Sequence, residues 1–334
     1  MTIDLPTIWA FIIAFAVFAY VVMDGFDLGL GLLFPFFKSH HDRDVIMNSV
    51  APVWDGNETW LVLGGGGLMA AFPLAYAVLM PALYTPVIAM LLGLIFRGVA
   101  FEFRWRARRE GNFWDVAFAA GSLLAALAQG VALGAILQGV TVSGRAYGGG
   151  WWDWLTPFTI LTGVALVVGY ALLGATWLIM KTTGELRERA YMLSWRLLFA
   201  TLAGLVAVSL ATPFLNVDYW HRWFTWPSLA YTAPVPILVA LVTFLLLRSL
   251  DRRQDVRPFV LTLVLFAITY AGLGVSMYPF IVPQSITIWQ AAAPAKSQQF
   301  MLVGVAILIP MIIAYTAFAY WVFRGKVDPQ AGYH

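Results

Sequence analysis

Residues 8–37 read IWAFIIAFAVFAYVVMDGFDLGLGLLFPFF, a run in which Asp24 and Asp27 are the only charged side chains. A membrane-spanning helix needs about 20 mostly apolar residues, so this run is long enough to cross a bilayer. No Lys or Arg precedes it, and it extends far beyond the apolar core of a signal peptide. We therefore expect a first spanning helix that is retained rather than cleaved.

The rest of the chain has the same character. Of its 334 residues, 61% are hydrophobic and 11% are charged, whereas about a quarter of a soluble domain is charged. Cysteine is absent, which excludes disulfides, iron–sulfur clusters and thiolate metal sites. A net charge of only +3 does not favour nucleic acid as a partner. The composition predicts a multi-pass membrane protein, with residues 1–334 forming a single membrane domain.

Apolar runs separated by charged or aromatic loops predict an all-α fold with nine transmembrane helices. Their approximate limits are 8–37, 52–72, 74–101, 113–140, 157–180, 191–212, 229–249, 258–280 and 300–323. Prolines support several boundaries, because Pro73 separates the second and third runs while Pro157 and Pro258 open the fifth and eighth. Periodicity alone leaves open whether segments one to four and five to eight form two bundles.

The basic residues orient the predicted helices. With the N-terminus outside, all but three of the 20 Lys and Arg residues fall on the inner side, Arg108 and Arg109 among them. The exceptions are Arg145, Arg222 and Lys296. Because cytoplasmic loops carry the excess of Lys and Arg, we expect a periplasmic N-terminus and a cytoplasmic C-terminus.

The predicted outer loops are aromatic, with Trp151, Trp152, Trp154, Tyr219, Trp220, Trp223, Phe224 and Trp226. Anchoring at the level of the lipid headgroups is the favoured interpretation, because indole rings prefer that depth. A cleft for a lipid-like quinone head is the alternative, and nothing in the spacing selects it.

Two pairs of carboxylates lie near the predicted cytoplasmic face. Asp24 and Asp27 are spaced i,i+3 and project from nearly the same side of the first helix. Asp55 and Glu58 repeat that spacing at the start of the second helix. Arg97, near the inner end of the third segment, could neutralise one of the four acids. Since they cannot all be buried and ionised cheaply, at least one is expected to hold a proton and to pass protons inward.

A structural explanation competes with proton transfer for one of the two pairs. Asp55 and Glu58 follow Pro52 in the first turns of a helix, where acids complement the helix dipole. Asp24 and Asp27 lie well inside an apolar helix, where a functional role is favoured.

Other polar and small residues are expected to serve packing. Residues 64–67 are four consecutive glycines, which favour close helix contact rather than phosphate binding. Gln129 and Gln138 are expected to form hydrogen bonds between helices. None of the four His residues lies in the middle of a predicted helix, where a membrane cytochrome places its haem ligands. We therefore expect neither haem nor a metal ion to be bound by this chain.

Several motifs, in order along the chain, resemble subunit II of the cytochrome bd-type quinol oxidases. They are DGFDLG at 24–29, NSVAPVWDGN at 48–57, FRGVAFEFR at 96–104, TGEL at 183–186, MYPF at 277–280, TIW at 287–289 and AYTA at 314–317. The resemblance runs from residue 24 to about residue 325, which is nearly the whole chain.

The resemblance implies a fold of two four-helix bundles plus one peripheral helix. It also implies a heterodimer in the bacterial inner membrane with a haem-bearing subunit I, which holds b-type haem together with d-type or further b-type haem. That subunit oxidises quinol on the outer side and reduces dioxygen to water with protons from the cytoplasm, so this chain is not catalytic alone. The family leaves room for a structural quinone and for a small single-helix third subunit.

By motif position, the resemblance assigns the proton route to Asp24, Asp27 and Asp55, with Trp54 beside them. The sequence departs from the family at Glu58, where Gln is frequent, and at Gln290, where a carboxylate is frequent. The loop 216–226 is short, as in the cyanide-insensitive branch. Two rival readings are a secondary transporter that uses the four acids as a coupling-ion site and a purely structural assembly subunit.

Overall fold

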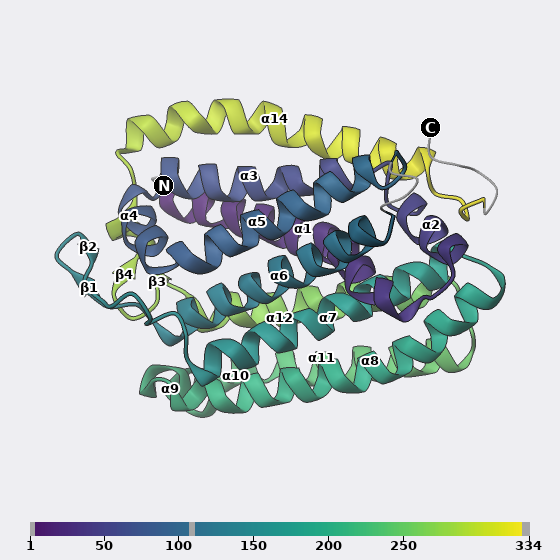
Figure 1. Ribbon diagram of the computed structural model, residues 1–334. Coiled ribbons are helices and arrows are strands. Elements are labelled where there is room, and N and C mark those ends of the chain that lie inside the picture. Colours follow the sequence, from purple (N-terminus) through teal and green to yellow (C-terminus); the bar gives the residue numbers. More distant parts are fainter. Residues whose placement is uncertain (1–3, 107–110, 329–334) are drawn as a thin grey trace.

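The computed structural model describes residues 4–106 and 111–328 (Figure 1). Arg108 and Arg109 of the predicted inner side lie outside the described residues. The long helices are α1 (Leu5–Leu33), α3 (Trp54–Ala71), α5 (Tyr84–Phe103), α6 (Gly111–Gln138), α7 (Pro157–Lys181), α8 (Gly184–Ala211), α11 (Pro234–Asp251), α12 (Arg257–Met277) and α14 (Ala295–Val322).

Shorter elements join the long helices. They are the 3-10 turns Phe34–Phe36 and Thr212–Phe214, the helices α2 (His40–Asn48), α4 (Pro73–Ala82), α9 (Val217–Phe224), α10 (Leu229–Thr232) and α13 (Ile288–Ala291), and two small antiparallel hairpins. The hairpins pair β1 (Val142–Ser143) with β2 (Ala146–Tyr147) and β3 (Phe280–Val282) with β4 (Ile286–Thr287). All strands lie at the end of the molecule that holds the N-terminus (Figure 1).

Eight helices of the described residues are long and apolar enough to cross a membrane. Together they account for eight of the nine expected segments. The remaining segment, 52–72, is helix α3, which lies alongside α1 but begins with Asp55, Asn57 and Glu58. These polar first turns lower the mean hydropathy of α3. Its length is nonetheless close to that of a spanning helix, because 18 residues rise about 27 Å and the hydrocarbon core of a bilayer is about 30 Å thick.

The expected helix 74–101 is two helices. It divides into α4 and α5 at Leu83, which caps both. Pro86 explains the break, because a proline ring collides with the carbonyl four residues earlier and has no N–H to donate to it. That carbonyl belongs to Ala82, the last residue of α4. A prediction based on hydropathy passes over this break because the flanking residues are uniformly apolar.

Some expected boundaries also move by several residues. Helix α8 begins at Gly184 rather than at about 191, because the charged residues that were assigned to a loop continue the helix. Their side chains pair along the surface, as in the contact of 2.5 Å between Arg189 and Glu185, one turn apart. Helix α1 begins at Leu5 because Asp4 caps it and accepts a hydrogen bond from the Thr7 amide.

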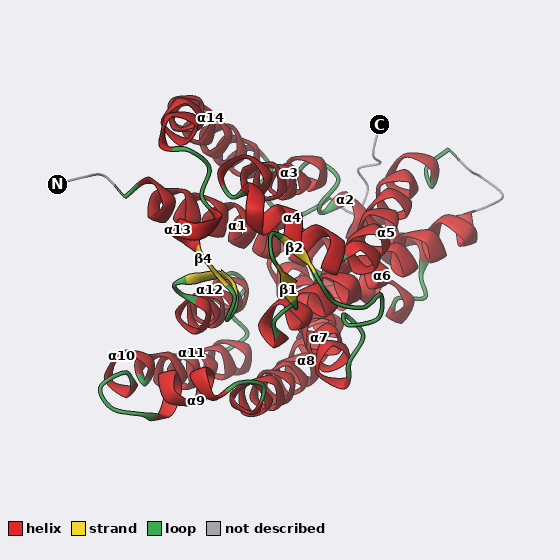
Figure 2. Cartoon of the chain, turned by 90° about the vertical axis from the view of Figure 1, so that its left-hand side faces the viewer, coloured by secondary structure: helices red, strands yellow, loops and turns green. Residues whose placement is uncertain are grey.

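Helix α1 lies at the centre and contacts α3, α6, α7, α12 and α14. Figure 2 shows these helices grouped around it in the view along their axes. Its approach to α7 requires glycine on both sides, because a Cβ atom on Gly29 would lie 1.9 Å from the Tyr170 carbonyl oxygen. A Cβ atom on Gly174 would lie 2.5 Å from the Gly29 carbonyl carbon. Small residues thus allow two backbones to touch, as in other membrane helix pairs.

The four consecutive glycines of α3 divide between two faces. Gly64 and Gly67 face Val17 and Ile13 of α1, as expected for close contact, whereas Gly65 and Gly66 have open space around them. Gln129 and Gln138 form the expected contacts between elements: Gln129 bonds Tyr20 and Tyr170, and Gln138 accepts from Thr156 at the start of α7.

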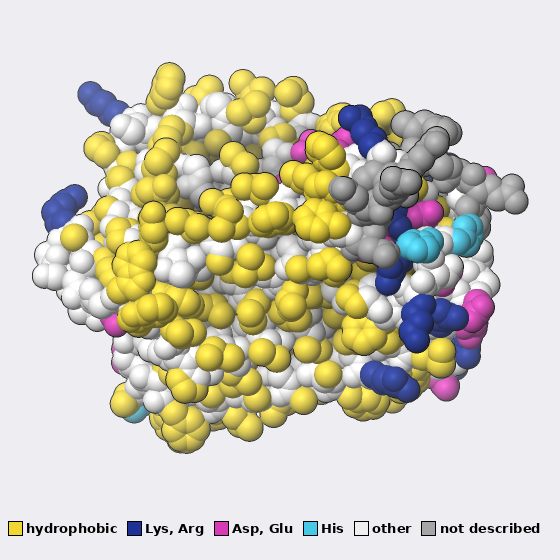
Figure 3. Space-filling view, in the orientation of Figure 1, with side chains coloured by type: hydrophobic (Ala, Val, Ile, Leu, Met, Phe, Trp, Pro, Cys, Tyr) yellow, Lys and Arg dark blue, Asp and Glu magenta, His cyan; other side chains and the backbone are white. Residues whose placement is uncertain are grey.

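The two ends of the molecule differ in charge. Lys and Arg side chains gather at the end that holds α2 and the last turn of α14, and few lie at the opposite end (Figure 3). The described chain enters α1 at the sparsely charged end and leaves α14 at the basic end (Figure 1). Helix α14 lies on the outside of the molecule, and Gln298 is its only buried residue.

Candidate functional site

Asp24 and Asp27 lie in the second half of α1 and are completely buried. Each receives a polar partner from a different helix. Arg97 Nη1 of α5 lies 2.6 Å from Asp24 Oδ1, and Asn57 Nδ2 of α3 donates to Asp27 Oδ2 at 2.7 Å. The i,i+3 spacing therefore places the two carboxylates on adjoining faces, one toward α5 and the other toward α3.

Arg97 joins two of the predicted acids. Its guanidinium is wholly buried and also pairs with Glu58 of α3, whose side chain remains 26% exposed. A buried guanidinium is tolerated in an apolar interior only when it is paired. The expectation that Arg97 neutralises an acid thus agrees with its position between Asp24 and Glu58. We call Asp24, Asp27, Glu58 and Arg97 the acidic cluster, which holds three carboxylates and one cation.

Trp54 lines the cluster and Asp55 lies outside it. The Trp54 ring stacks on Phe101 with centroids 4.8 Å apart and planes 5° from parallel. Its centroid lies 6.0 Å from the Arg97 guanidinium carbon, within the range of a cation–π contact. Asp55 is exposed in the first turn of α3, where a carboxylate complements the helix dipole. The two acids of the second predicted pair therefore occupy different surroundings.

Two polar branches lead away from the acidic cluster, and of their residues only Gln129 was expected from the sequence to bond between helices. On one side, Tyr320 of α14 donates to Asn57 Oδ1 at 2.8 Å. On the other, Tyr170 of α7 donates to Gln129 Oε1 at 2.8 Å, and Gln129 Nε2 donates to Tyr20 at 2.7 Å. Tyr20 stands one turn before Asp24 on α1, which was a usable signal, whereas nothing in the sequence links Tyr320 to Asn57.

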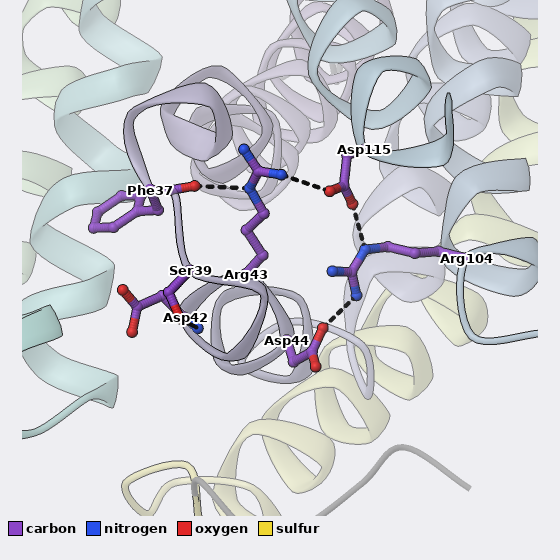
Figure 4. A network of polar contacts seen from close by, with 7 residues as sticks. All are labelled: Phe37, Ser39, Asp42, Arg43, Asp44, Arg104 and Asp115. Atoms are coloured by element: carbon purple, nitrogen blue, oxygen red, sulfur yellow. Dashed lines mark hydrogen bonds and ion pairs between the residues drawn. The ribbon is translucent and has the colours of Figure 1, made fainter. Parts of the chain in front are cut away.

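A second ionic network connects α2 with the ends of α5 and α6 (Figure 4). Asp115 accepts from Arg43 Nη1 at 2.7 Å and from Arg104 Nε at 2.5 Å. Arg104 Nη1 also bonds Asp44 at 2.6 Å, and Arg43 Nε bonds the Phe37 carbonyl at 2.7 Å. With two arginines on one buried carboxylate, the network is compensated and fixes α2 in place. Its two cations and two acids leave no excess acid, unlike the acidic cluster.

The opposite end of the molecule carries the expected aromatic residues. Trp151, Trp152 and Trp226 are exposed there, which suits contact with headgroups. Burial and the neighbouring Asp153 raise the pKa of Tyr147 to about 12, so its hydroxyl stays a donor to Gly150 and Asp153 within the loop.

Gln290 has a local structural role. Its Oε1 accepts from the Thr287 amide at 2.9 Å and from the Thr287 hydroxyl at 3.0 Å, which caps the short helix α13. The carboxylate near Trp289 comes from elsewhere in the chain, because the indole Nε1 donates to both oxygens of Asp4 at 3.1 Å. Hydrogen bonding by Thr7 lowers the pKa of Asp4, so this acceptor stays ionised.

The described residues offer no histidine within a long helix as a haem ligand. Haem iron needs an axial ligand such as His, yet His40 and His41 begin α2 and His221 lies in α9, all outside the long helices. Within residues 4–106 and 111–328, no group of three or more His, Cys, Asp or Glu side chains is placed to hold a metal ion.

Comparison with known proteins gives a consistent result. Residues 5–323 match the family model described as cytochrome bd terminal oxidase subunit II. The chain is 32% identical to cytochrome bd-I ubiquinol oxidase subunit 2 of Escherichia coli (strain K12), over 97% of this chain and 95% of that protein. It is 26% identical to cytochrome bd ubiquinol oxidase subunit 2 of Bacillus subtilis (strain 168), over 97% of both chains.

The fold is also similar to a solved structure. A chain of the bd oxidase from Geobacillus thermodenitrificans superposes with a TM-score of 0.76 at 18% identity, over 96% of this chain and 99% of that one. At this identity the match is a statement about the fold.

Proposed function

Because the chain belongs to the family of cytochrome bd terminal oxidase subunit II, a subunit of an oxidoreductase complex in the bacterial inner membrane, we propose that its acidic cluster supplies protons from the cytoplasm to a haem-bearing subunit I. The expected family is confirmed by these comparisons, and the transporter is not favoured. Among the described residues, every fully buried acid lies in α1 or α6. The second half of the chain therefore has no counterpart of the site, unlike the paired halves of many transporters.

The proton route rests on one observation: three carboxylates lie in a largely buried site whose one guanidinium pairs with only two of them, Asp24 and Glu58. Their charges cannot all be compensated by Arg97, so the cluster is favoured with a bound proton. Glu58 is the partly exposed member and would exchange protons with the inner side. Asp24 and Asp27 would receive them through carboxylate oxygens that have no directed hydrogen bond among the described residues.

The subunit I partner would dock on the exposed face of α3. Asp55, Thr59, Val62, Gly66 and Met69 are exposed and follow a spacing of four and three residues, which defines one stripe along the helix. Lipid tails do not solvate a carboxylate, and open space at Gly66 admits a close helix. A partner helix on this stripe would lie beside Glu58 and shorten the path of the proton.

The cofactors and the topology complete the proposal. The haems, which supply the electron transfer and the oxygen chemistry, would belong to subunit I, because no His among the described residues lies within a long helix. Helix α3 would be the ninth spanning helix of one membrane domain, with two four-helix bundles and α14 peripheral. The basic end in Figure 3 supports a cytoplasmic C-terminus and a periplasmic N-terminus.

Purification of the tagged chain from native membranes in mild detergent tests the assignment to a haem-bearing complex. A reduced-minus-oxidised spectrum with haem bands and a second membrane protein is expected, while a colourless solitary chain would refute it. The Asp24→Asn variant then tests the proton route: assembly and haem content should persist while turnover falls at least tenfold. Asp251→Asn, at the exposed inner end of α11, is the matched control. Unchanged turnover in Asp24→Asn would refute the proton route and favour a purely structural role for this subunit.

A further inference from the structure

Helix α14 reaches the acidic cluster through a single side chain, Tyr320. The Tyr320 hydroxyl donates to Asn57 Oδ1 at 2.8 Å, and Asn57 Nδ2 donates to Asp27 Oδ2 at 2.7 Å. An amide offers an acceptor on one side and a donor on the other. As long as the hydroxyl of Tyr320 occupies the Oδ1 side, the NH₂ group must face Asp27.

The hydrogen bond from Asn57 is the one that Asp27 receives among the described residues, because Asp27 Oδ1 is buried without a partner. The other charged or titratable groups facing Asp27 are Asp24 of the same helix, Glu58 of α3, Arg97 of α5 and Tyr320 of α14. Two of these groups are acids that oppose ionisation of Asp27, and the one cation is already engaged by both of them. The hydrogen bond from Asn57 therefore supplies a large share of the stabilisation that the charged form of Asp27 receives.

Two lysines hold the inner end of α14 against α7. Each donates to backbone carbonyls at the end of the opposite helix: Lys181 to Phe323 and to Gly325 (3.1 Å), and Lys326 to Ile179 (3.2 Å) and to Thr182 (3.1 Å). We call Lys181 and Lys326 the lysine clasp. Carbonyls that end a helix have no partner within it, so each lysine satisfies groups that would otherwise stay unpaired.

The segment after α14 is also held by the Val327 amide, which donates to the Lys181 carbonyl at 2.8 Å, and by the ion pair of Lys326 with Asp255 at 3.0 Å, so the lysines belong to a larger attachment at this end. At the outer end of α14, Gln298 accepts from Trp9 at 3.2 Å and donates to the Ala71 carbonyl at 3.3 Å. Between these two ends, α14 presents mostly exposed side chains. Tyr320 lies about one turn before the carbonyls that the lysine clasp binds, so loosening of the attachment at the lysine clasp would let Tyr320 leave Asn57.

We propose that Tyr320 is a positioning residue for Asp27: its hydroxyl fixes the Asn57 amide with the NH₂ group toward the carboxylate, and the lysine clasp keeps Tyr320 within reach. This inference rests on the proposed role of the acidic cluster in proton uptake. It adds that the last helix of the chain, which supplies no acid, sets the pH range in which Asp27 can accept a proton.

The Tyr320→Phe variant of the whole complex tests the positioning role. Loss of the hydroxyl leaves the amide oriented only by its NH₂ contacts with Asp27 and the Met23 carbonyl (3.5 Å), so the donor to Asp27 is held less firmly, and Asp27 ionises less readily and must lose its proton at higher pH. The acid limb of the turnover–pH profile should then move to higher pH by about one unit, which corresponds to the loss of one hydrogen bond to a charged group. Tyr315→Phe is the matched control, because Tyr315 lies on the same helix and is 70% exposed.

Two results separate this inference from the function on which it rests. An unmoved profile in Tyr320→Phe, together with lost turnover in Asp27→Asn, would overturn the positioning role alone. Normal turnover in Asp27→Asn would overturn the role of Asp27 in proton uptake and the positioning role with it. Haem content measured in each preparation excludes a defect of assembly.

Lys326→Met tests the lysine clasp in the same assay. We expect faster amide hydrogen exchange at residues 318–323 and a shift of the acid limb in the same direction as in Tyr320→Phe. Arg324→Gln is the control, because among the described residues the contacts of Arg324 are with the carbonyl and ring of the nearby Trp321. Faster exchange with an unmoved pH profile would overturn the link between the lysine clasp and Asp27.

Discussion

Replacing Arg97 by Met removes the cation that the acidic cluster shares. Arg97 is fully buried and lies 2.6 Å from Asp24. Two unit charges about 4 Å apart attract by about 4 kcal/mol at an effective dielectric constant of 20. Removal of one partner of a buried ion pair typically costs roughly 3–5 kcal/mol, because the other charge is left without compensation. We therefore expect Arg97→Met to lower the stability of the complex by a few kcal/mol.

A double variant identifies the origin of that loss. In Arg97→Met with Asp24→Asn, the buried carboxylate that contacted the guanidinium directly is also gone, and Glu58 can turn toward water from its partly exposed position. The double variant should recover at least half of the stability lost in Arg97→Met. Thermal denaturation of the detergent-solubilised complex, followed by size-exclusion chromatography, measures both. Arg252→Met, at an exposed position of the inner surface, should change stability by no more than about 0.5 kcal/mol.

Additive losses would refute this reasoning. If the double variant is destabilised by the sum of the two single variants, Arg97 and Asp24 act independently and the short contact between them carries no coupling. Turnover supplies a second criterion. The double variant should be stable but have low turnover, because it lacks one carboxylate of the proposed proton route. A stable double variant with full turnover would refute a role for Asp24 in proton transfer.

Three further perturbations test other parts of the structure. Asp115→Asn should cost about 3 kcal/mol in thermal unfolding, because Arg43 and Arg104 lose their shared carboxylate, whereas loss of the 40% exposed Asp44 should cost less than about 1 kcal/mol. Gly29→Ala should prevent α1 from reaching α7 and lower the yield of folded protein, while Gly274→Ala, in open space, should not. Gly66→Leu should reduce the amount of subunit I that co-purifies, and Gly304→Leu of α14 serves as its control.

The positions of the spanning helices were predictable because the bilayer imposes a simple rule on hydropathy. Eight expected segments correspond to helices that satisfy that rule. The division at Leu83 was not predicted, because it depends on the stereochemistry of Pro86 rather than on polarity. The start of α8 was misplaced for a related reason: charged residues can continue a helix beyond the membrane, and hydropathy detects only the apolar part.

The charged residues of the candidate site could be predicted from the sequence, whereas the neutral residues that hydrogen-bond to them could not. An acid in an apolar helix is easily recognised in the sequence. Its loss of hydration is costly, so such a residue is retained for a function or is compensated by an ion pair. Asp24, Asp27 and Arg97 were found in this way. Asn57 and Tyr320 are ordinary residues by composition, and only the packing of α14 against α3 brings them together. The spacing i,i+3 also grouped Asp55 with Glu58, but a net rotation of about 60° between them is enough for Glu58 to reach Arg97 while Asp55 stays exposed.

The acidic cluster and the fold depend on each other. Asp24 and Asp27 belong to α1, but their partners come from α3 and α5, and Asn57 is in turn fixed from α14. No single helix could carry these carboxylates into a membrane at low cost, so the site is stable only after the helices have assembled. The Arg97→Met variant will therefore alter the amount of assembled complex as well as its rate. Turnover must be expressed per haem, because this distinguishes slower proton transfer from a smaller amount of assembled complex. The pH profile does not depend on the amount of complex and is therefore the stricter measurement.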